Sequence, residues 1–327
     1  MQLVADIGGT KGNFAIIDPA QPGRILAEAT LASRDYPDLT ALVRAYLDRS
    51  GHRPQRACLA VPGPVVAGRA VMATLDWVAE EGALARDLGL GSVRLINDLV
   101  ATACGLPLLP AADLVTLHAG ANRADESAPL PGEVRAVIAP GTGLGESFCT
   151  FDGARWGAHP SEGGHAAFAP HDDDGVDLWR FVHAREGFVT MQSVCSGLGI
   201  AMVWRWLSAR GRGSEPAAVT AAINAAPDPT RELLGHLDTS ERCRLAVERF
   251  VELLADEAAD VALRLLPMGG IYLGGGLPPR LLPYLRDGRF VRRYLSHPEL
   301  SYLHQTIPVR VVLNAKTALL GAVYHGG

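Results

Sequence analysis

Several classes of protein are excluded by what this chain of 327 residues has little of. Its five cysteines are scattered and odd in number, without Cys-x-x-Cys spacing, so we expect neither a disulfide framework nor a zinc site but five small buried hydrophobes. The net charge is −5 and Lys and Arg form no block, which argues against nucleic acid as a partner. No apolar run approaches the roughly 20 residues of a membrane span, and no basic leader precedes the first strand. We therefore expect a cytoplasmic protein that binds small molecules and not a membrane.

The length and one repeated pattern predict two lobes of α/β structure. A single core stops growing at about 250–300 residues, and this chain is longer. An apolar strand, a glycine turn and a returning strand occur at residues 3–17 and again at 134–151, which indicates an internal duplication. We place a small lobe at residues 1–107 with 315–327, and a large lobe at 108–314, facing each other across a cleft. Residues 119–132 are expected to be a surface loop.

Hydrophobic periodicity assigns most of the remaining elements. Beyond the two hairpins, the polar, proline-containing stretch 209–230 receives no element. The other strands are expected at 24–31, 56–61, 93–96, 271–273 and 308–313, with a short β excursion at 65–72. The helices are expected at 39–50, 80–88, 99–106, 201–207, 241–266 and 316–324.

The strand Val93–Ile96 ends at Asn97 and Asp98, and this pair is the candidate for chemistry. In open α/β sheets ligands bind at the carboxyl ends of strands, which makes the Asp98 carboxylate a candidate catalytic group. Asn and Asp are also preferred N-caps, so the pair can equally begin the helix that follows. The two roles are compatible if one residue caps and its neighbour faces the ligand.

Three glycine turns follow apolar strands and are candidate phosphate sites. Glycine lets backbone N–H groups converge on an anion, although a lone Gly-Gly more often serves a tight hairpin. None of the turns fits the Walker A pattern or the dinucleotide pattern, so we expect a nucleotide gripped between two lobes instead. The turns are Gly8-Gly9-Thr10, Gly141-Thr142-Gly143 and Gly274-Gly275-Gly276.

Two further stretches carry polar side chains suited to ligands. Asp6 ends the first strand, where a carboxylate would hold Mg²⁺ beside phosphates or would simply cap the turn. In Ser161-Glu162-Gly163-Gly164-His165, Glu162 and His165 lack the third and fourth ligands of a metal site. They suit a polyhydroxyl ligand better, while a structural role for His165 stays open.

Taken together, six motifs resemble bacterial ATP-dependent glucokinases in order and spacing over essentially the whole chain. The resemblance implies duplicated RNase H-like, actin-like ATPase lobes with mixed five-stranded sheets flanked by helices. It implies Asp98 as the general base that takes the proton of the sugar 6-hydroxyl, with ATP and Mg²⁺ as cofactors and glucose as the hexose. Asn97, Glu162 and His165 match hexose-binding positions, the first two glycine turns match phosphate turns, and 274–276 matches a segment near the adenosine. The motifs are Asp6–Thr10, Leu95–Asp98, Ala139–Gly145, Ser161–His165, Ser196–Gly199 and Leu273–Gly276.

Two departures from this family bear on the sugar. Thr74 stands where the family usually has Asn, and Gln192 stands where it typically has Glu. A neutral amide makes weaker hydrogen bonds than a carboxylate, so sugar affinity or sugar preference is expected to differ. Alternatives are a kinase for another hexose, a sugar-binding regulatory protein with little activity, and an ATPase of the same fold that acts without sugar. The resemblance also implies a homodimer.

Overall fold

The computed structural model divides the chain into two compact units. The structure describes residues 1–18, 21–72, 74–121 and 128–325. The first unit comprises Met1–Asp113, Ser147–Pro160 and Asn314–Gly327, and the second comprises Leu114–Glu146 and Ser161–Leu313. Residues 147–160, which we had placed in the large lobe, group with the first unit. Two contacts hold them there: Ser147 Oγ donates to the Leu99 carbonyl oxygen at 2.7 Å, and the Trp156 N–H donates to the Tyr324 hydroxyl at 3.1 Å. The predicted lobe boundaries remain a proposal.

A mixed five-stranded sheet forms the first unit, in the order β3-β2-β1-β4-β8. Its first three strands are antiparallel, as expected, while β1, β4 and β8 run parallel to one another. Parallel neighbours end at the same edge, so the carboxyl ends of these three strands are adjacent. The strands are β1 (Gln2–Ile7), β2 (Lys11–Asp18), β3 (Gln21–Ala32), β4 (Arg56–Val61) and β8 (Ser92–Asn97).

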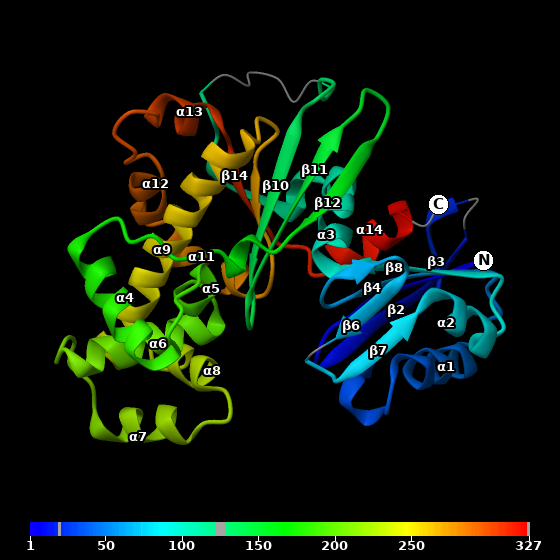
Figure 1. Ribbon diagram of the computed structural model, residues 1–327, viewed down its shortest axis with the longest axis horizontal. Coiled ribbons are helices and arrows are strands. Elements are labelled where there is room, and N and C mark those ends of the chain that lie inside the picture. Colours follow the sequence, from blue (N-terminus) through cyan, green and yellow to red (C-terminus); the bar gives the residue numbers. More distant parts are fainter. Residues whose placement is uncertain (19–20, 73, 122–127, 326–327) are drawn as a thin grey trace. The chain divides into compact units, whose positions relative to one another are not determined.

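Helices cover both faces of this sheet (Figure 1). The alternation of β1 sends Leu3, Ala5 and Ile7 into the core with α1 and α2, whereas Val4 packs with Leu319 of α14 on the other face. The closing helix thus packs on the first strand, as the sequence predicted for the small lobe. The helices are α1 (Leu39–Ser50), α2 (Glu81–Leu88), α3 (Asp98–Gly105) and α14 (Thr317–His325).

The β excursion after β4 is a three-stranded antiparallel sheet, β5-β6-β7. Its strands are β5 (Val65–Val66), β6 (Arg69–Met72) and β7 (Trp77–Glu80). The expected helix at 80–88 therefore begins one residue later, at Glu81. On β7 the side chains alternate, with Trp77 and Ala79 buried and Val78 and Glu80 exposed. This period of two residues explains why Glu80 belongs to the strand and not to the helix.

The second sheet has six strands where we expected five, in the order β12-β11-β10-β13-β14-β9. The sixth is β9, which pairs antiparallel with β14 and has no fully buried residue, so its hydrophobic alternation is weak in the sequence. β13 runs parallel to both β10 and β14. The strands are β9 (Leu114–His118), β10 (Val134–Pro140), β11 (Leu144–Phe151), β12 (Trp156–Ser161), β13 (Ile271–Leu273) and β14 (Val309–Val312).

Helix α9 (Glu241–Leu265) is the centre of the second unit's core, and its predicted extent is confirmed. In the stretch 209–230, which received no element, α7 buries Val219 and Ile223 one helical turn apart, and α8 begins at Pro229. The helices of this unit other than α9 are α4 (Asp173–Glu186), α5 (Met191–Val194), α6 (Gly197–Ala209), α7 (Ala217–Ala225), α8 (Pro229–Leu234), α10 (Leu277–Arg280), α11 (Leu282–Leu285), α12 (Arg289–Tyr294) and α13 (Ser301–Thr306).

Three smaller expectations can be compared with the structure. All five cysteines are buried, as predicted. Among the described helices, none combines the length and the apolar composition needed to cross a bilayer. Part of the expected loop 119–132, residues 122–127, lies outside the described residues.

Candidate active site

One edge of the first unit's sheet gathers the residues that the sequence singled out there. In the register of the parallel strands Asp6 lies beside Ala60, and the next residue of β4, Val61, lies beside Asn97. The turn Gly8–Thr10 leaves the same edge after β1. A methyl group built on Gly9 would lie 3.4 Å from Thr74 Oγ1, so the Thr74 hydroxyl lies against this turn.

Asn97 caps the helix, which leaves Asp98 as its first residue. The Asn97 Oδ1 accepts from the N–H groups of Leu99 at 2.9 Å and Val100 at 3.1 Å, while its Nδ2 donates to the Gly63 carbonyl at 3.0 Å. Asp98 is half-buried, and its Oδ1 accepts from the Leu99 N–H at 2.8 Å. The N-terminus of a helix stabilises a negative charge, so this position favours an ionised carboxylate. Asn97 therefore fills the capping role, and the catalytic role of Asp98 stays a prediction.

Asp6 is a desolvated carboxylate beside the first glycine turn. Burial raises the pKa of Asp6, against the lowering effects of a hydrogen bond with Asn13 and of the charge of Lys11. Within the described ranges no three His, Cys, Asp or Glu side chains come together as a metal site. A hard cation at Asp6 would therefore draw its other ligands from phosphate oxygens and water.

The other two glycine turns meet at one edge of the second sheet. They follow the neighbouring parallel strands β10 and β13, and the Gly274 N–H donates to the Ile138 carbonyl at 2.9 Å. Gly275 has φ +78°, and a Cβ there would lie 2.7 Å from the Pro140 carbonyl oxygen. Only glycine fits both the conformation and the close approach.

The N-terminus of α6 lies against the turn Gly141–Gly143. The helix is capped by Ser196, whose Oγ accepts from the Gly199 N–H at 3.0 Å. The Gly197 N–H donates to the Gly141 carbonyl at 2.8 Å, and the Leu198 N–H donates to the Thr142 carbonyl at 3.4 Å. The positive end of a 13-residue helix is thus directed at the turn that the sequence proposed for phosphate.

A pocket of about 340 Å³ opens beside these backbone groups. Its walls come from the β10–β11 turn, α6, the α7–α8 connection and α10, and they carry three arginines and one aspartate. Sequence reasoning identified Gly141, Thr142 and Gly276 but missed these charged residues, since they lie on helices without a local motif. The lining residues are Gly141, Thr142, Gly197, Leu198, Ala201, Arg205, Pro227, Asp228, Pro229, Thr230, Arg231, Leu234, Gly276, Leu277 and Arg280.

Gln192, predicted to contact the sugar, is bound to the backbone next to the phosphate turn. Its Oε1 accepts from the Leu144 N–H at 3.0 Å, and a Cβ on Gly143 would collide with the same oxygen. The Gln192 side chain therefore supports the start of β11, a role that its place in the sequence did not suggest.

The stretch Ser161–His165 exposes its two polar side chains above a tightly packed backbone. Glu162 and His165 are both exposed. Gly163 and Gly164 lie flush against β11, because a Cβ on Gly163 would collide with the Glu146 carboxyl and a Cβ on Gly164 with the Leu144 carbonyl. The two glycines are required for this close packing, so they determine how near to β11 the backbone that carries Glu162 and His165 lies.

The two units carry glycine turns inside two β-hairpins, a pocket at a helix N-terminus and a carboxylate at the first residue of α3. These features define a class, the sugar kinases of the actin-like ATPase fold. A family model described as Glucokinase matches residues 3–326. The chain is 35% identical to a glucokinase of Chromobacterium violaceum, over 99% of this chain and 88% of the relative. It is 31% identical to a glucokinase of Nostoc sp., over 98% of this chain and 97% of the relative. The chain therefore belongs to the glucokinase family, and its assignment as a glucokinase is confirmed.

Solved structures support the same fold. A glucokinase from an Antarctic psychrotroph has a TM-score of 0.79 and 29% identity, covering 99% of this chain and 98% of that one. A ROK family glucokinase of Streptomyces griseus, in complex with glucose and AMPPNP, has a TM-score of 0.64 at 19% identity, covering 99% of this chain and 98% of that one. The expected actin-like architecture is thus confirmed.

Proposed function

We propose that this glucokinase transfers the γ-phosphoryl group of ATP to the 6-hydroxyl of glucose with Asp98 as the general base. The observation that carries the proposal is the hydrogen bonding of Asn97 and Asp98 at the N-terminus of α3. Asn97 caps the helix and is fixed to Gly63, so Asp98 does not carry the cap alone. A carboxylate held in this way can accept the hydroxyl proton as the oxygen attacks phosphorus.

The nucleotide side of the proposal rests on the pocket of the second unit. We assign the phosphates to the backbone of Gly141–Gly143 and the N-terminus of α6, and the adenosine to the pocket bordered by Gly276. Arg205, Arg231 and Arg280 line this pocket and offset the charge of a triphosphate. The Streptomyces griseus neighbour holds AMPPNP, which supports ATP as the phosphoryl donor here. In the first unit, Gly8, Gly9 and Thr10 are assigned to the same phosphates.

Mg²⁺ is the metal that this chemistry calls for, and Asp6 is the residue we assign to it. A carboxylate oxygen is a ligand that Mg²⁺ prefers, and a single protein carboxylate with phosphate and water ligands is an ordinary Mg²⁺ site. When bound, Mg²⁺ neutralises charge that develops on the phosphates. Burial of Asp6 raises its pKa in the protein alone, so a cation beside it relieves the cost of ionisation.

For the sugar, we assign hydroxyl binding to Glu162 and His165 in the second unit and to Asn97 and Thr74 in the first. Gln192 is assigned a shared role, since its Oε1 is bound to Leu144 and its amide nitrogen can donate to a hydroxyl. Replacing Gln192 by Glu keeps an acceptor for Leu144 and restores a charge, so we expect a lower KM for glucose from Gln192→Glu.

The test of the base is Asp98→Asn, which keeps the shape of the side chain and an acceptor for Leu99. We expect kcat for glucose to fall by about 10²–10⁴, with glucose and ATP binding by calorimetry retained. The matched control is Asp38→Asn, because Asp38 likewise accepts a backbone N–H at the start of a helix, capping α1 through the Ala41 N–H at 2.7 Å. An Asp98→Asn enzyme as fast as the wild type would exclude Asp98 as the base.

Three finer assignments are also proposals. A coupled ADP-release assay across glucose, fructose, mannose, galactose and N-acetylated hexoses separates glucose kinase from a kinase for another hexose. The absence of turnover on every sugar would favour the regulatory alternative. We also propose a cytoplasmic homodimer, as the family resemblance implies, and light scattering on the purified protein measures its mass.

A further inference from the structure

A buried pair of carboxyl groups lies directly beneath the stretch that presents Glu162 and His165. Glu146 on β11 and Glu257 on α9 have 7% and 3% of their surface exposed, and their carboxyl groups influence each other's pKa. Two carboxylates cannot both be ionised in contact in a dry interior, so such a pair retains a proton. Burial accordingly raises the pKa of both groups.

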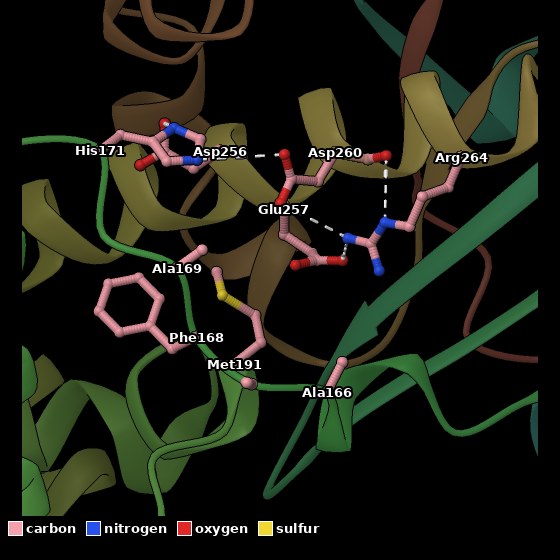
Figure 2. A pocket seen from close by; sticks show the side chains of 10 residues that line it. Ala166, Phe168, Ala169, His171, Met191, Asp256, Glu257, Asp260 and Arg264 are labelled. Atoms are coloured by element: carbon pink, nitrogen blue, oxygen red, sulfur yellow. Dashed lines mark hydrogen bonds and ion pairs between the residues drawn. The ribbon is translucent and has the colours of Figure 1, made fainter.

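A cation and a small cavity lie beside Glu257 and stabilise the one negative charge of the pair. Arg264 donates to Glu257 Oε1 at 2.7 Å and lies 3.7 Å from Asp260. Figure 2 shows Glu257, Asp260 and Arg264 on one side of a cavity of about 90 Å³, with Ala166 of the neighbouring segment on the other. Glu257 thus has both a cation and a small polar cavity beside it. Arg264 therefore offsets the one negative charge that the pair keeps, and burial together with the charge of Glu146 raises the pKa of Glu257 to about 9.

Glu146 is in direct contact with the backbone of the stretch Ser161–His165. Its Oε2 occupies the space where a side chain on Gly163 would be, and Leu144 makes the same kind of contact with Gly164 through its carbonyl. Leu144 is in turn held by Gln192, immediately after the phosphate turn. Residues 144–146 of β11 therefore lie between the turn Gly141–Gly143 and the stretch Ser161–His165 and contact the groups that support both.

We propose that Glu146 is a positioning residue for hexose binding: its buried carboxyl group lies against Gly163 and thereby sets where Glu162 and His165 meet the sugar. The proposal rests on the assignment of Glu162 and His165 to the hexose. If the pair loses its proton, two carboxylates repel beneath Gly163 and the stretch is displaced. The affinity for glucose should therefore decline as the pair is deprotonated, while the affinity for ATP should not.

Other charged groups around the pair set the direction of this effect. Arg264 favours ionisation of the pair, whereas the acidic neighbours oppose it. The groups that face or adjoin the pair are Arg264, Asp260 and Asp256 on α9, Cys195 after α5, and His171 before α4, which lies 3.3 Å from Asp256. His171 is half-buried, and its pKa is raised through its hydrogen bond with Asp256, so its titration must be separated from that of the pair.

The experiment compares Glu146→Gln with Glu146→Ala in the full chain, measuring the KM for glucose and for ATP from pH 6 to pH 9.5. Glutamine is neutral and can donate to Glu257, so Glu146→Gln should keep a low KM for glucose and make it independent of pH. Glu146→Ala removes the carboxyl group that lies against Gly163 and should raise the KM for glucose by about tenfold, the equivalent of about 1.4 kcal/mol. The KM for ATP should be unchanged in both. In the wild type, the KM for glucose should rise at alkaline pH.

Two controls keep the result specific. Glu133→Ala removes another buried carboxyl group, at the approach to β10, and should lower stability without changing the KM for glucose. His171→Gln removes the other titrating group and should leave the alkaline rise in place. If Glu146→Ala does not fold, Glu146→Asp, which withdraws the carboxyl from Gly163, replaces it with the same expected rise.

The outcomes separate this inference from the function on which it rests. A KM for glucose that is the same in Glu146→Ala and wild type would overturn the positioning role, as would a Glu146→Gln enzyme as impaired as Glu146→Ala. A wild type that phosphorylates glucose, with an Asp98→Asn variant that does not, would leave the proposed function intact in either case. A wild type without turnover or glucose binding would refute the proposed function itself.

Discussion

Gly197→Ala is the substitution that tests the nucleotide site most directly. Gly197 is the first residue of α6, and its N–H donates to the Gly141 carbonyl at 2.8 Å. An added Cβ would lie 2.8 Å from the same oxygen, where ordinary van der Waals contact begins at about 3.4 Å. The colliding atom belongs to the backbone of the phosphate turn, so the turn or the helix must shift.

The size of the effect follows from two opposing contributions. Alanine is the better helix former by up to about 1 kcal/mol, which alone would make the variant slightly more stable. Overpacking costs about 1–3 kcal/mol, and a displaced turn also weakens a hydrogen bond worth about 1 kcal/mol. If this strain is expressed as displacement of the phosphate-binding backbone, a loss of about 1–3 kcal/mol corresponds to a rise of about 5–150-fold in the KM for ATP.

The assay is steady-state ADP release at varied ATP and saturating glucose, with thermal unfolding measured in the presence and absence of ATP. Gly82→Ala is the matched control, because Gly82 also lies in the first turn of a helix, α2, and a Cβ there meets only the Arg86 side chain at 3.5 Å. We expect this control to leave the kinetics unchanged and to raise the stability slightly, because it gains helix propensity without a collision. A Gly197→Ala enzyme with a normal KM for ATP would refute the assignment of this turn to the phosphates.

Two further predictions concern stability. Arg249 is buried and donates to both oxygens of Asp172, at 2.7 and 3.0 Å, and to Glu252 at 3.0 Å. Arg249→Met should cost about 3 kcal/mol in chemical denaturation, because it leaves Glu252 without this cation and leaves Asp172 with Arg293, at 3.0 Å, as its remaining partner of opposite charge. Burial of Asp172 alone would raise its pKa, but the hydrogen bonds from Arg249 and from the backbone lower it to about 2. The stability that ionised Asp172 contributes is thus fully present above the pKa of Asp172 in the unfolded chain and is lost as the pH falls towards 2. In Arg249→Met this loss should begin at a higher pH. A free energy of unfolding that falls with pH in the same way in Arg249→Met and wild type would contradict this. Asn97→Ala removes a cap and the hydrogen bond to Gly63 and should lower the free energy of unfolding by about 1–2 kcal/mol, whereas Asn97→Asp, which keeps the cap, should lose less.

Local patterns in the sequence were sufficient for much of the fold. The alternation of β1, the apolar run of β4 and the long periodic stretch of α9 depend on neighbours along the chain, and all three elements form where expected. The elements that were missed lack such a pattern. Strand β9 has no fully buried residue, and α7 shows only two buried positions.

The candidate site divides in the same way. The glycine turns are visible in the sequence because a glycine cluster after an apolar strand is a local signal. The capping role of Asn97 was open until its hydrogen bonds to Gly63 and Val100 were known, and the catalytic role of Asp98 stays a prediction. The support of Leu144 by Gln192, 48 residues away, has no counterpart in any short motif.

The sequence by itself determined the class of fold, the motifs in their order and the family to which the chain belongs, because these depend on residue types at short spacings. Only the tertiary structure decided which distant side chains come into contact. Glu146, Gly163 and Glu257 come from three separate parts of the chain, and their contact arises from the packing of β11, the segment after β12, and α9. The burial that perturbs their charges exists only in the folded chain, since a carboxyl group in the unfolded chain is surrounded by water.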